Sequence, residues 1–220
     1  MRWWMGVCFL LALASPAAAE TLELSGRAVT IELPAGYCAL DRAHPMDREI
    51  FAVTEDVNLT AQYLFHAVSC ENLEAWHEGR SSGLDRYMNA VTPLLDGAPQ
   101  TIGGLTRSRF LWQMKQSLPA LDLEEIQTDI DRMYDETDMS IGGIQLLGVV
   151  AEDENALYVA LAATVETDVG ETVAASLWAT TALNSVIVFV YLTSDMSPGI
   201  HETLADEIAP YMAELVRLNP

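Results

Sequence analysis

Four apolar segments separated by short polar turns fill the last third of the chain and constrain its fold more than any other feature. They span residues 143–150, 156–165, 173–183 and 186–193. Each has the length of a strand, and Asp153-Glu154-Asn155 and Asn184 mark two of the turns. Because connections this short can join only antiparallel neighbours, the pattern predicts a four-stranded antiparallel meander.

Alternating polar and apolar residues predict further strands near the start of the chain. The runs on either side of Ser25-Gly26 are typical of a hairpin. The run 59–68 predicts a longer strand, with Tyr63 and Phe65 on the same face. Before it, we expect a loop over 38–47 and a short helix or strand over 49–53.

The middle of the chain carries apolar residues at helical spacing. We predict helices over 71–78, 84–95 and 106–118. Another helix should follow Pro119, and Pro198 should introduce the last one, with Pro210 producing a kink. The apolar sides of these last two helices hold Leu123, Ile126, Ile130 and Met133 in the first, and Leu204, Ile208, Tyr211 and Leu215 in the second.

The helix after Pro119 has an acidic polar side. Acids in its first turns complement the helix dipole, whereas Asp135, Glu136 and Asp138 at the far end oppose it, so we expect fraying after Tyr134. Calcium loops need closely spaced oxygen donors and usually a glycine for the sharp turn. The run 122–138 has no such glycine, and it is interpreted as a solvated helix face.

These elements place the chain in the α+β class. The predicted antiparallel sheet combines an N-terminal hairpin plus strand with the C-terminal four-stranded meander, and helices from the middle and the C-terminus pack on it. Because the sequence of 220 residues shows no internal repeat and no linker, we expect residues 20–220 to form a single domain.

The first residues have the pattern of a secretory signal peptide. Arg2 precedes an apolar stretch from Trp3 to Ala14, and Ala17-Ala18-Ala19 follows the break at Ser15-Pro16. We predict a signal peptide over 1–19, with cleavage after Ala19. Since a spanning helix needs about 20 apolar residues, the mature chain is expected to be a soluble protein of the periplasm or a secreted one, with no membrane span.

The charge of the chain argues against nucleic acid as a partner. The sequence has 11 basic and 32 acidic residues, and loss of the leader changes its net charge from −21 to −22. Binding of phosphate backbones needs clustered cations. Outside the leader only Cys38 and Cys70 remain, and in an oxidising compartment such a pair is expected to form a disulfide.

The segment Val29-Thr30-Ile31-Glu32-Leu33-Pro34-Ala35-Gly36-Tyr37, the terminal meander and the closing helix together resemble the PsbP/Mog1-like family of small α/β proteins. The resemblance covers the two ends of the chain and leaves about 70–138 unexplained. It implies an antiparallel sheet with flanking helices. Because members of that family act mostly as accessory or binding proteins without catalytic residues, it implies no site residues and no enzyme.

Gly79-Arg80-Ser81-Ser82-Gly83 matches the G-x-S-x-G pattern of serine hydrolases. That chemistry needs the serine on a tight turn between a buried strand and a helix, but the residues before Gly79 are helix-like. The alternative interpretation is a loop between two helices, with Gly79 ending the first and Ser81 or Ser82 capping the second. A serine hydrolase using Ser81 is therefore the rival hypothesis.

No metal site and no cofactor are predicted. Cys38, His44, His66 and Cys70 could make a zinc set, but His66 and Cys70 would lie roughly 13 Å apart on a strand, which is too far for one ion. The four histidines, including His77 and His201, show no ligand spacing. Three tryptophans are expected to be buried or half-buried rather than ligand-stacking platforms: Trp76, Trp112 and Trp178.

A stretch at the start of the predicted helix over 106–118 is a candidate anion site. Gly103 and Gly104 would expose backbone N–H groups, Thr106 would cap the helix, and Arg107 and Arg109 could hold an anion. The alternative is ordinary loop chemistry, with the arginines paired to acids. With no catalytic constellation in the sequence, we expect an exported, non-catalytic binding or accessory protein whose partner is another protein or a small molecule.

Overall fold

A computed structural model describes residues 19–220 except 56–57, 59, 82, 136–139 and 168–169. It contains a two-stranded sheet and an eight-stranded one, which together with five α-helices confirm the α+β class. The predicted leader lies outside the described residues, apart from Ala19. Among the described residues, no helix combines the length and apolar character that crossing a membrane requires.

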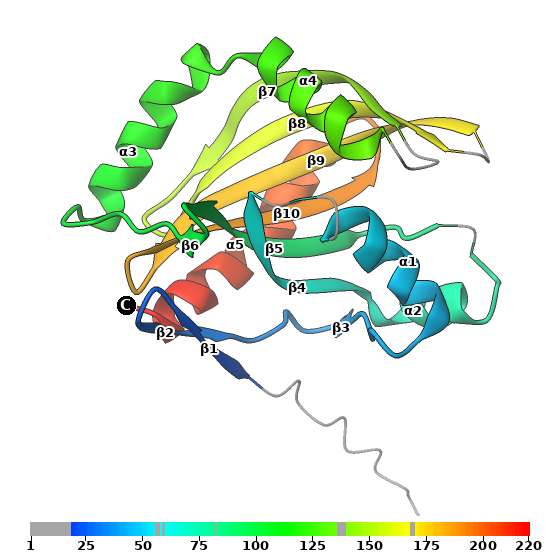
Figure 1. Cartoon of the computed structure of the whole chain (residues 1–220), viewed down its shortest axis with the longest axis horizontal. Coiled ribbons are helices and arrows are strands. Elements are labelled where there is room, and N and C mark those ends of the chain that lie inside the picture. Colours follow the sequence, from blue (N-terminus) through cyan, green and yellow to red (C-terminus); the bar gives the residue numbers. More distant parts are fainter. Residues whose placement is uncertain (1–18, 56–57, 59, 82, 136–139, 168–169) are drawn as a thin grey trace, which may run out of the picture.

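The large sheet is antiparallel throughout its described pairings (Figure 1). Its order is β3 (Tyr37–Ala39), β4 (Ala61–Ser69), β5 (Tyr87–Leu95), β10 (Val186–Asp195), β9 (Gly170–Leu183), β8 (Leu157–Thr167) and β7 (Ser140–Glu152), and β6 (Ala98–Pro99) pairs with β5. The predicted meander is therefore confirmed as β7 to β10. The predicted hairpin, β1 (Glu20–Leu24) with β2 (Arg27–Ile31), forms the separate two-stranded sheet.

The predicted helix over 84–95 is wrong, because this segment forms β5 in the middle of the large sheet. Met88 and Ala90 are buried on one face of the sheet, while Asn89 and Val91 lie on the other, which is the alternation of a strand. Pro93 would interrupt a helix. In β5 it lies beyond Val91, the last residue paired with β10, so its missing N–H breaks no bond to that strand.

The strand predicted over 59–68 is β4, but its alternation is not continuous. Its register with β5 shifts between Tyr63 and Phe65. Phe65 packs edge-on against Tyr211 of the last helix, with ring centroids 6.3 Å apart, whereas Tyr63 lines the opposite side of the sheet. The prediction that these two rings share a face is wrong, because a bulge adds a residue between them.

The helices form two layers on either side of the sheet (Figure 1). Helix α5 (Ile200–Leu218) covers one face and buries its predicted apolar stripe completely or nearly so. Pro210 lies inside α5. On the opposite side, α3 (Arg107–Ser117) places Phe110 and Leu111 on Leu157 and Val159 of β8. A short 3-10 turn, η1 (Leu118–Ala120), leads from α3 into α4 (Leu123–Tyr134), and the fraying predicted after Tyr134 falls largely outside the described residues.

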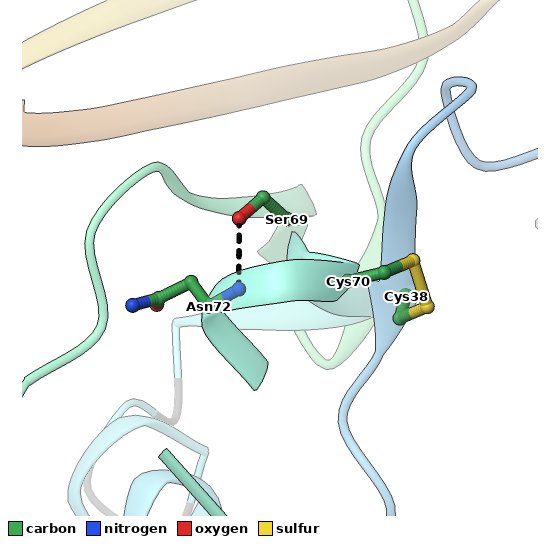
Figure 2. The surroundings of a disulfide bond; sticks show 4 residues. All are labelled: Cys38, Ser69, Cys70 and Asn72. Atoms are coloured by element: carbon green, nitrogen blue, oxygen red, sulfur yellow. Dashed lines mark hydrogen bonds between the residues drawn. A yellow bond between two sulfur atoms is a disulfide. The ribbon is translucent and has the colours of Figure 1, made fainter. Parts of the chain in front are cut away.

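Two short helices pack beside β3 and β4. The segment 49–53, expected as helix or strand, is part of α1 (Pro45–Thr54), so the loop predicted over 38–47 is shorter than expected. The predicted helix over 71–78 is α2 (Cys70–His77), whose first turn is capped by the Ser69 side chain accepting from the N–H of Asn72 (Figure 2). The predicted Cys38–Cys70 disulfide is confirmed and joins β3 to the start of α2.

Candidate functional site

A cavity of about 580 Å³ lies between α4 and the face of the large sheet opposite α5. Its volume is within the range of about 300–1,000 Å³ found for small-molecule sites. The strands of the predicted meander supply most of the cavity floor, and β4 and β5 supply the rest. The helical segment around α4 closes the cavity from the other side. The residues that line it are Asn58, Thr60, Ala61, Tyr63, Asn89, Val91, Pro93, Leu121, Leu123, Ile126, Ile130, Met133, Tyr134, Ile141, Ile144, Leu146, Leu161, Ala162, Ala163, Val165, Ala174, Ser176, Trp178, Phe189, Tyr191 and Thr193.

Aromatic side chains form the floor of the cavity. Trp178 of β9 makes an edge-on contact with Phe189 of the neighbouring β10, with ring centroids 5.4 Å apart, and its ring lies 6.4 Å from that of Tyr191. These residues alternate with inward-facing residues of the α5 core, such as Leu177 and Val190. The same strands therefore bury one side chain in the core and present the next to the cavity.

Helix α4 roofs the cavity with its apolar stripe. Leu123, Ile126, Ile130 and Met133 all line the cavity, and no residue of α4 is fully buried. The helix begins at Asp122, whose carboxylate accepts from the N–H groups of Glu124 and Glu125. Gln127 anchors it to β7 by donating from Nε2 to the Ile141 carbonyl at 2.7 Å. The stripe predicted from the sequence thus faces a cavity rather than a packed core.

Among its described lining residues the cavity carries no aspartate, glutamate, histidine, lysine or arginine, although the chain is strongly acidic. Burial raises the pKa of the Tyr63 and Tyr191 hydroxyls and raises that of Tyr134 to about 12, so all three tyrosines are neutral at physiological pH. Polar groups are present but few. The hydroxyls of Ser176 and Thr193 lie 3.1 Å apart across β9 and β10.

One hydrogen-bond donor of the cavity wall is unused within the described part of the chain. The Trp178 Nε1–H is buried and has no acceptor there. A buried donor without a partner costs about 1–3 kcal/mol. An acceptor atom on a bound molecule could satisfy the indole, if the molecule places it beside Nε1.

A buried histidine supports the wall behind Tyr63. His66 is 3 % exposed, and its ring stacks on Tyr63 with centroids 4.6 Å apart. Its Nε2 lies 2.9 Å from the Glu55 carboxylate, and its Nδ1 is hydrogen bonded to the Tyr87 hydroxyl. Burial lowers the pKa of His66, against the opposing effect of Glu55. The network ties α1 and β5 to the strand that carries Tyr63.

The predicted anion-binding residues lie at the start of α3, away from the cavity lining. Thr106 caps α3 by accepting from the N–H of Arg109, and Gly103 and Gly104 are exposed in the preceding loop. Arg107 donates to the carbonyls of Ala182 and Asn219, at 2.9 and 3.1 Å. The Arg109 guanidinium lies 4.2 Å from the ring centroid of Trp112. These contacts are all within the protein and do not bear on anion binding, so the anion site stays a prediction.

Ser81 lies in the loop between α2 and β5. Gly79 ends α2 with a positive φ of 68°, as expected for a residue after a helix. No helix begins at Ser81, so its predicted role as a helix cap is wrong, and Ser82 lies outside the described residues. The Ser81 hydroxyl donates to the Gly83 carbonyl at 2.6 Å. This helix-to-strand loop differs from the strand-to-helix turn that a hydrolase nucleophile occupies.

Other sequence candidates have structural partners. Cys38 and Cys70 form the disulfide, so neither offers a thiolate to the zinc set that the strand spacing argued against. The acids of α4 lie along an exposed face, where Asp129 pairs with Arg132 at 2.8 Å. Trp76 and Trp178 are half-buried as predicted, although Trp178 also lines the cavity. Trp112 is 47 % exposed, which contradicts its prediction. His44 and His77, far apart in sequence, lie side by side.

Comparisons with known proteins give only a weak resemblance at the level of the fold. No protein family matches this sequence, and no curated protein is similar to it in sequence. The solution structure of cyanobacterial PsbP (CyanoP) from Synechocystis sp. PCC 6803 is similar at the level of the fold. The two share 8 % sequence identity and a TM-score of 0.36, over 97 % of this chain and 96 % of the other. The resemblance expected from the sequence is thus present at the fold level alone.

Proposed function

We propose that this chain is an exported, non-catalytic binding protein whose cavity takes a small, uncharged and largely apolar molecule. The observation that carries the proposal is the uncharged, aromatic-floored cavity under an amphipathic helix, in a chain with a net charge of −21. A charged molecule would lose its hydration there without gaining an ion pair. An apolar one would complete the burial of the α4 stripe.

Export is the second part of the proposal. Two observations support it: the leader-like pattern of the first residues and the Cys38–Cys70 disulfide, which persists in oxidising compartments. In the proposed mature form, residues 20–220 act as a single domain. Mass spectrometry of the native protein should find Glu20 at the N-terminus, whereas an intact Met1 with free thiols would contradict export.

A neutral fluorescent dye tests the cavity directly. N-phenyl-1-naphthylamine should bind the purified mature chain with a stoichiometry near one and enhanced emission. Ala174→Phe should abolish this binding, because Ala174 lines the cavity between β8 and β10 and a ring there fills the space. Val173→Phe is the matched control, since Val173 is 44 % exposed and lies outside the cavity lining. Equal dye binding by both variants would contradict the proposal.

The rival functions predict different results. A hydrolase using Ser81 should react with a fluorophosphonate probe at that residue, and it should lose the reaction in Ser81→Ala. An anion-binding module at residues 103–109 should be stabilised against heat by phosphate. Arg109→Ala tests that module better than Arg107→Ala, because Arg107 also holds two main-chain carbonyls. Either positive result, without dye binding, would replace the cavity proposal.

A further inference from the structure

Two histidines and an aspartate converge between α1 and the end of α2, outside the cavity lining. His44 precedes Pro45 at the N-cap position of α1, where its side chain makes no capping hydrogen bond. Asp47 lies in the first turn of the same helix, and His77 is the last residue of α2. One nitrogen of each ring and one Asp47 oxygen all lie within 4.8 Å of one another. No spacing in the sequence reveals this group, because His77 is contributed by a separate helix.

Asp47 is the buried centre of the cluster. Its side chain is fully buried, and its Oδ2 accepts from the main-chain N–H of Asp41 at 2.8 Å. The other oxygen, Oδ1, faces both rings: it lies 2.6 Å from His77 Nε2 and 3.6 Å from His44 Nδ1. The carboxylate is therefore held by the backbone through Oδ2 and presents Oδ1 to two imidazoles.

The His44 ring is positioned by stacking, and not by a hydrogen bond of its Nδ1 atom within the described residues. It stacks on the His77 ring with centroids 3.6 Å apart and an interplanar angle of 26°. Its Nδ1 atom is buried and has no hydrogen-bond partner in the described part of the chain. A buried nitrogen left in this way is costly as a purely structural feature. Coordination of a cation that is also bound by Asp47 and His77 would satisfy it.

We propose that His44 Nδ1, Asp47 Oδ1 and His77 Nε2 form a site for a divalent transition-metal ion such as Zn²⁺ or Cu²⁺. Two imidazoles and one carboxylate suit these ions, whereas Mg²⁺ and Ca²⁺ prefer sets made only of oxygen. Three protein ligands are also the number found in zinc sites that keep an open position. The Asp41 N–H is the outer contact that orients the carboxylate.

Binding requires modest side-chain movement. Ligand atoms 2.0–2.2 Å from one zinc ion in a tetrahedral arrangement lie about 3.3 Å from each other. The distance from His77 Nε2 to Asp47 Oδ1 must therefore lengthen from 2.6 Å, and the distance from His44 Nδ1 to Asp47 Oδ1 must shorten from 3.6 Å. The two histidine side chains are 32 % and 26 % exposed, so they can rotate, while buried Asp47 stays in place.

The disulfide limits the relative movement of the two chain segments that carry the ligands. Cys38 lies six residues before His44 and Cys70 seven residues before His77. The bond thus links the segment that leads to α1 covalently to the first residue of α2. Because the cysteines are oxidised, they tether the site and do not ligate the ion. The negative charge of the chain also favours cation uptake, against the opposing dipole at the start of α1.

Titration calorimetry with ZnCl₂ tests the site in the purified, disulfide-bonded chain. The unmodified chain should take up one Zn²⁺ with a site-specific affinity, and Co²⁺ should give visible absorption bands of nitrogen and oxygen ligands. His44→Ala and His77→Ala should each weaken Zn²⁺ binding at least tenfold. His201→Gln is the control, because His201 hydrogen bonds to the Leu161 carbonyl outside the cluster and should leave affinity unchanged.

Folding of the variants is checked by circular dichroism. His77→Ala loses a short hydrogen bond to a buried carboxylate and can be less stable, but His44→Ala removes only a stacking contact and a long ion pair. A folded His44→Ala chain that binds Zn²⁺ as the unmodified chain does would overturn the proposal, since uptake would then come from surface carboxylates. Absence of Zn²⁺ binding by the unmodified chain would overturn it too.

Discussion

Asn219 joins the two ends of the chain through its side chain. It is fully buried, its Oδ1 accepts from the Thr30 N–H at 2.7 Å, and its Nδ2 donates to the carbonyls of Thr30 and Leu215. The N-terminal hairpin is thereby attached to the end of α5. A single side chain, placed next to the last residue, supplies both a donor and an acceptor to the edge of β2.

Replacing this side chain should loosen the hairpin. We expect Asn219→Ala to lower the free energy of unfolding by about 1–3 kcal/mol, because buried polar groups of Thr30 and Leu215 lose their partners. Urea denaturation measures the change. Thr21→Ala, which removes only the exposed hydrogen bond between the Thr21 and Thr30 hydroxyls, should stay within about 0.5 kcal/mol. Equal effects of the two substitutions would contradict the role given to Asn219.

The Cys38–Cys70 disulfide should stabilise the fold by lowering the conformational entropy of the unfolded chain. With a sequence separation of 32, the chain-entropy estimate for closing this loop is about 3.7 kcal/mol. We expect Cys38→Ser/Cys70→Ser to lose up to that amount in urea denaturation. Reducing agent should destabilise the unmodified chain and leave the double variant unchanged. A reductant effect of equal size in both would show that the disulfide is not its cause.

At the scale of the elements, α4 and α5 are both amphipathic but are packed differently. Ile208 of α5 is fully buried in the main core, whereas Ile130 of α4 is half-buried and faces the cavity. The periodicity of the sequence predicts both stripes equally well. Only the space left beneath α4 distinguishes a helix that completes a core from one that roofs a cavity.

The same substitution in the two helices should therefore have unequal costs. We expect Ile208→Ala to lose about 2–5 kcal/mol of stability, as buried isoleucines do, and Ile130→Ala to lose about 1 kcal/mol or less. Urea denaturation compares them. Amide hydrogen exchange should also be faster in α4 than in α5, because few buried contacts oppose its local opening. Equal losses in the two variants would mean that α4 is packed as a core helix.

The sequence distinguished strand from helix wherever its residue pattern fitted only one of the two. The meander was predictable because its short turns allow only antiparallel neighbours. The segment 84–95 was not, since Tyr87, Met88 and Val91 fit a helical stripe as well as a strand with two buried faces. Its place between β4 and β10 decided the matter, and that pairing joins residues almost a hundred positions apart.

For the molecule as a whole, the buried tyrosines predict loss of stability in alkali. Burial raises the pKa of Tyr134 to about 12 and raises those of Tyr63, Tyr87 and Tyr191 as well. In the unfolded chain tyrosine ionises near pH 10. The contribution of these tyrosines to the free energy of unfolding is complete below about pH 10. It is lost as the pH rises towards their pKa values in the folded chain, because over that range only the unfolded chain releases their protons.

Urea denaturation between pH 8 and 11.5 measures this loss. The free energy of unfolding should be steady up to about pH 10, apart from general charge effects, and should then fall with a slope that grows with the number of buried tyrosines. Tyr134→Phe should make the fall less steep. A slope in that variant equal to that of the unmodified chain would contradict the assignment of Tyr134 as a contributor.

The candidate site was predictable only in its parts. The alternation of Ala174, Ser176 and Trp178 along one strand and the stripe around Ile130 were both visible in the sequence. Their meeting across a cavity was not, because it depends on the path of α3 and η1 over the sheet. The sequence placed Tyr63 on the same face of the sheet as Phe65, which is wrong because a β-bulge lies between them. The alternation of residues gives no sign of that bulge.

The sequence by itself determined the α+β class, the meander, the buried stripe of α5 and the pairing of two cysteines, because each follows from local periodicity, turn chemistry or the absence of other partners. Tertiary structure alone decided that β5 links the two ends of the sheet, that α4 leaves a cavity beneath it, and that His44 and His77 meet at Asp47. Those features depend on contacts between residues distant in sequence, and local patterns do not encode which distant faces meet.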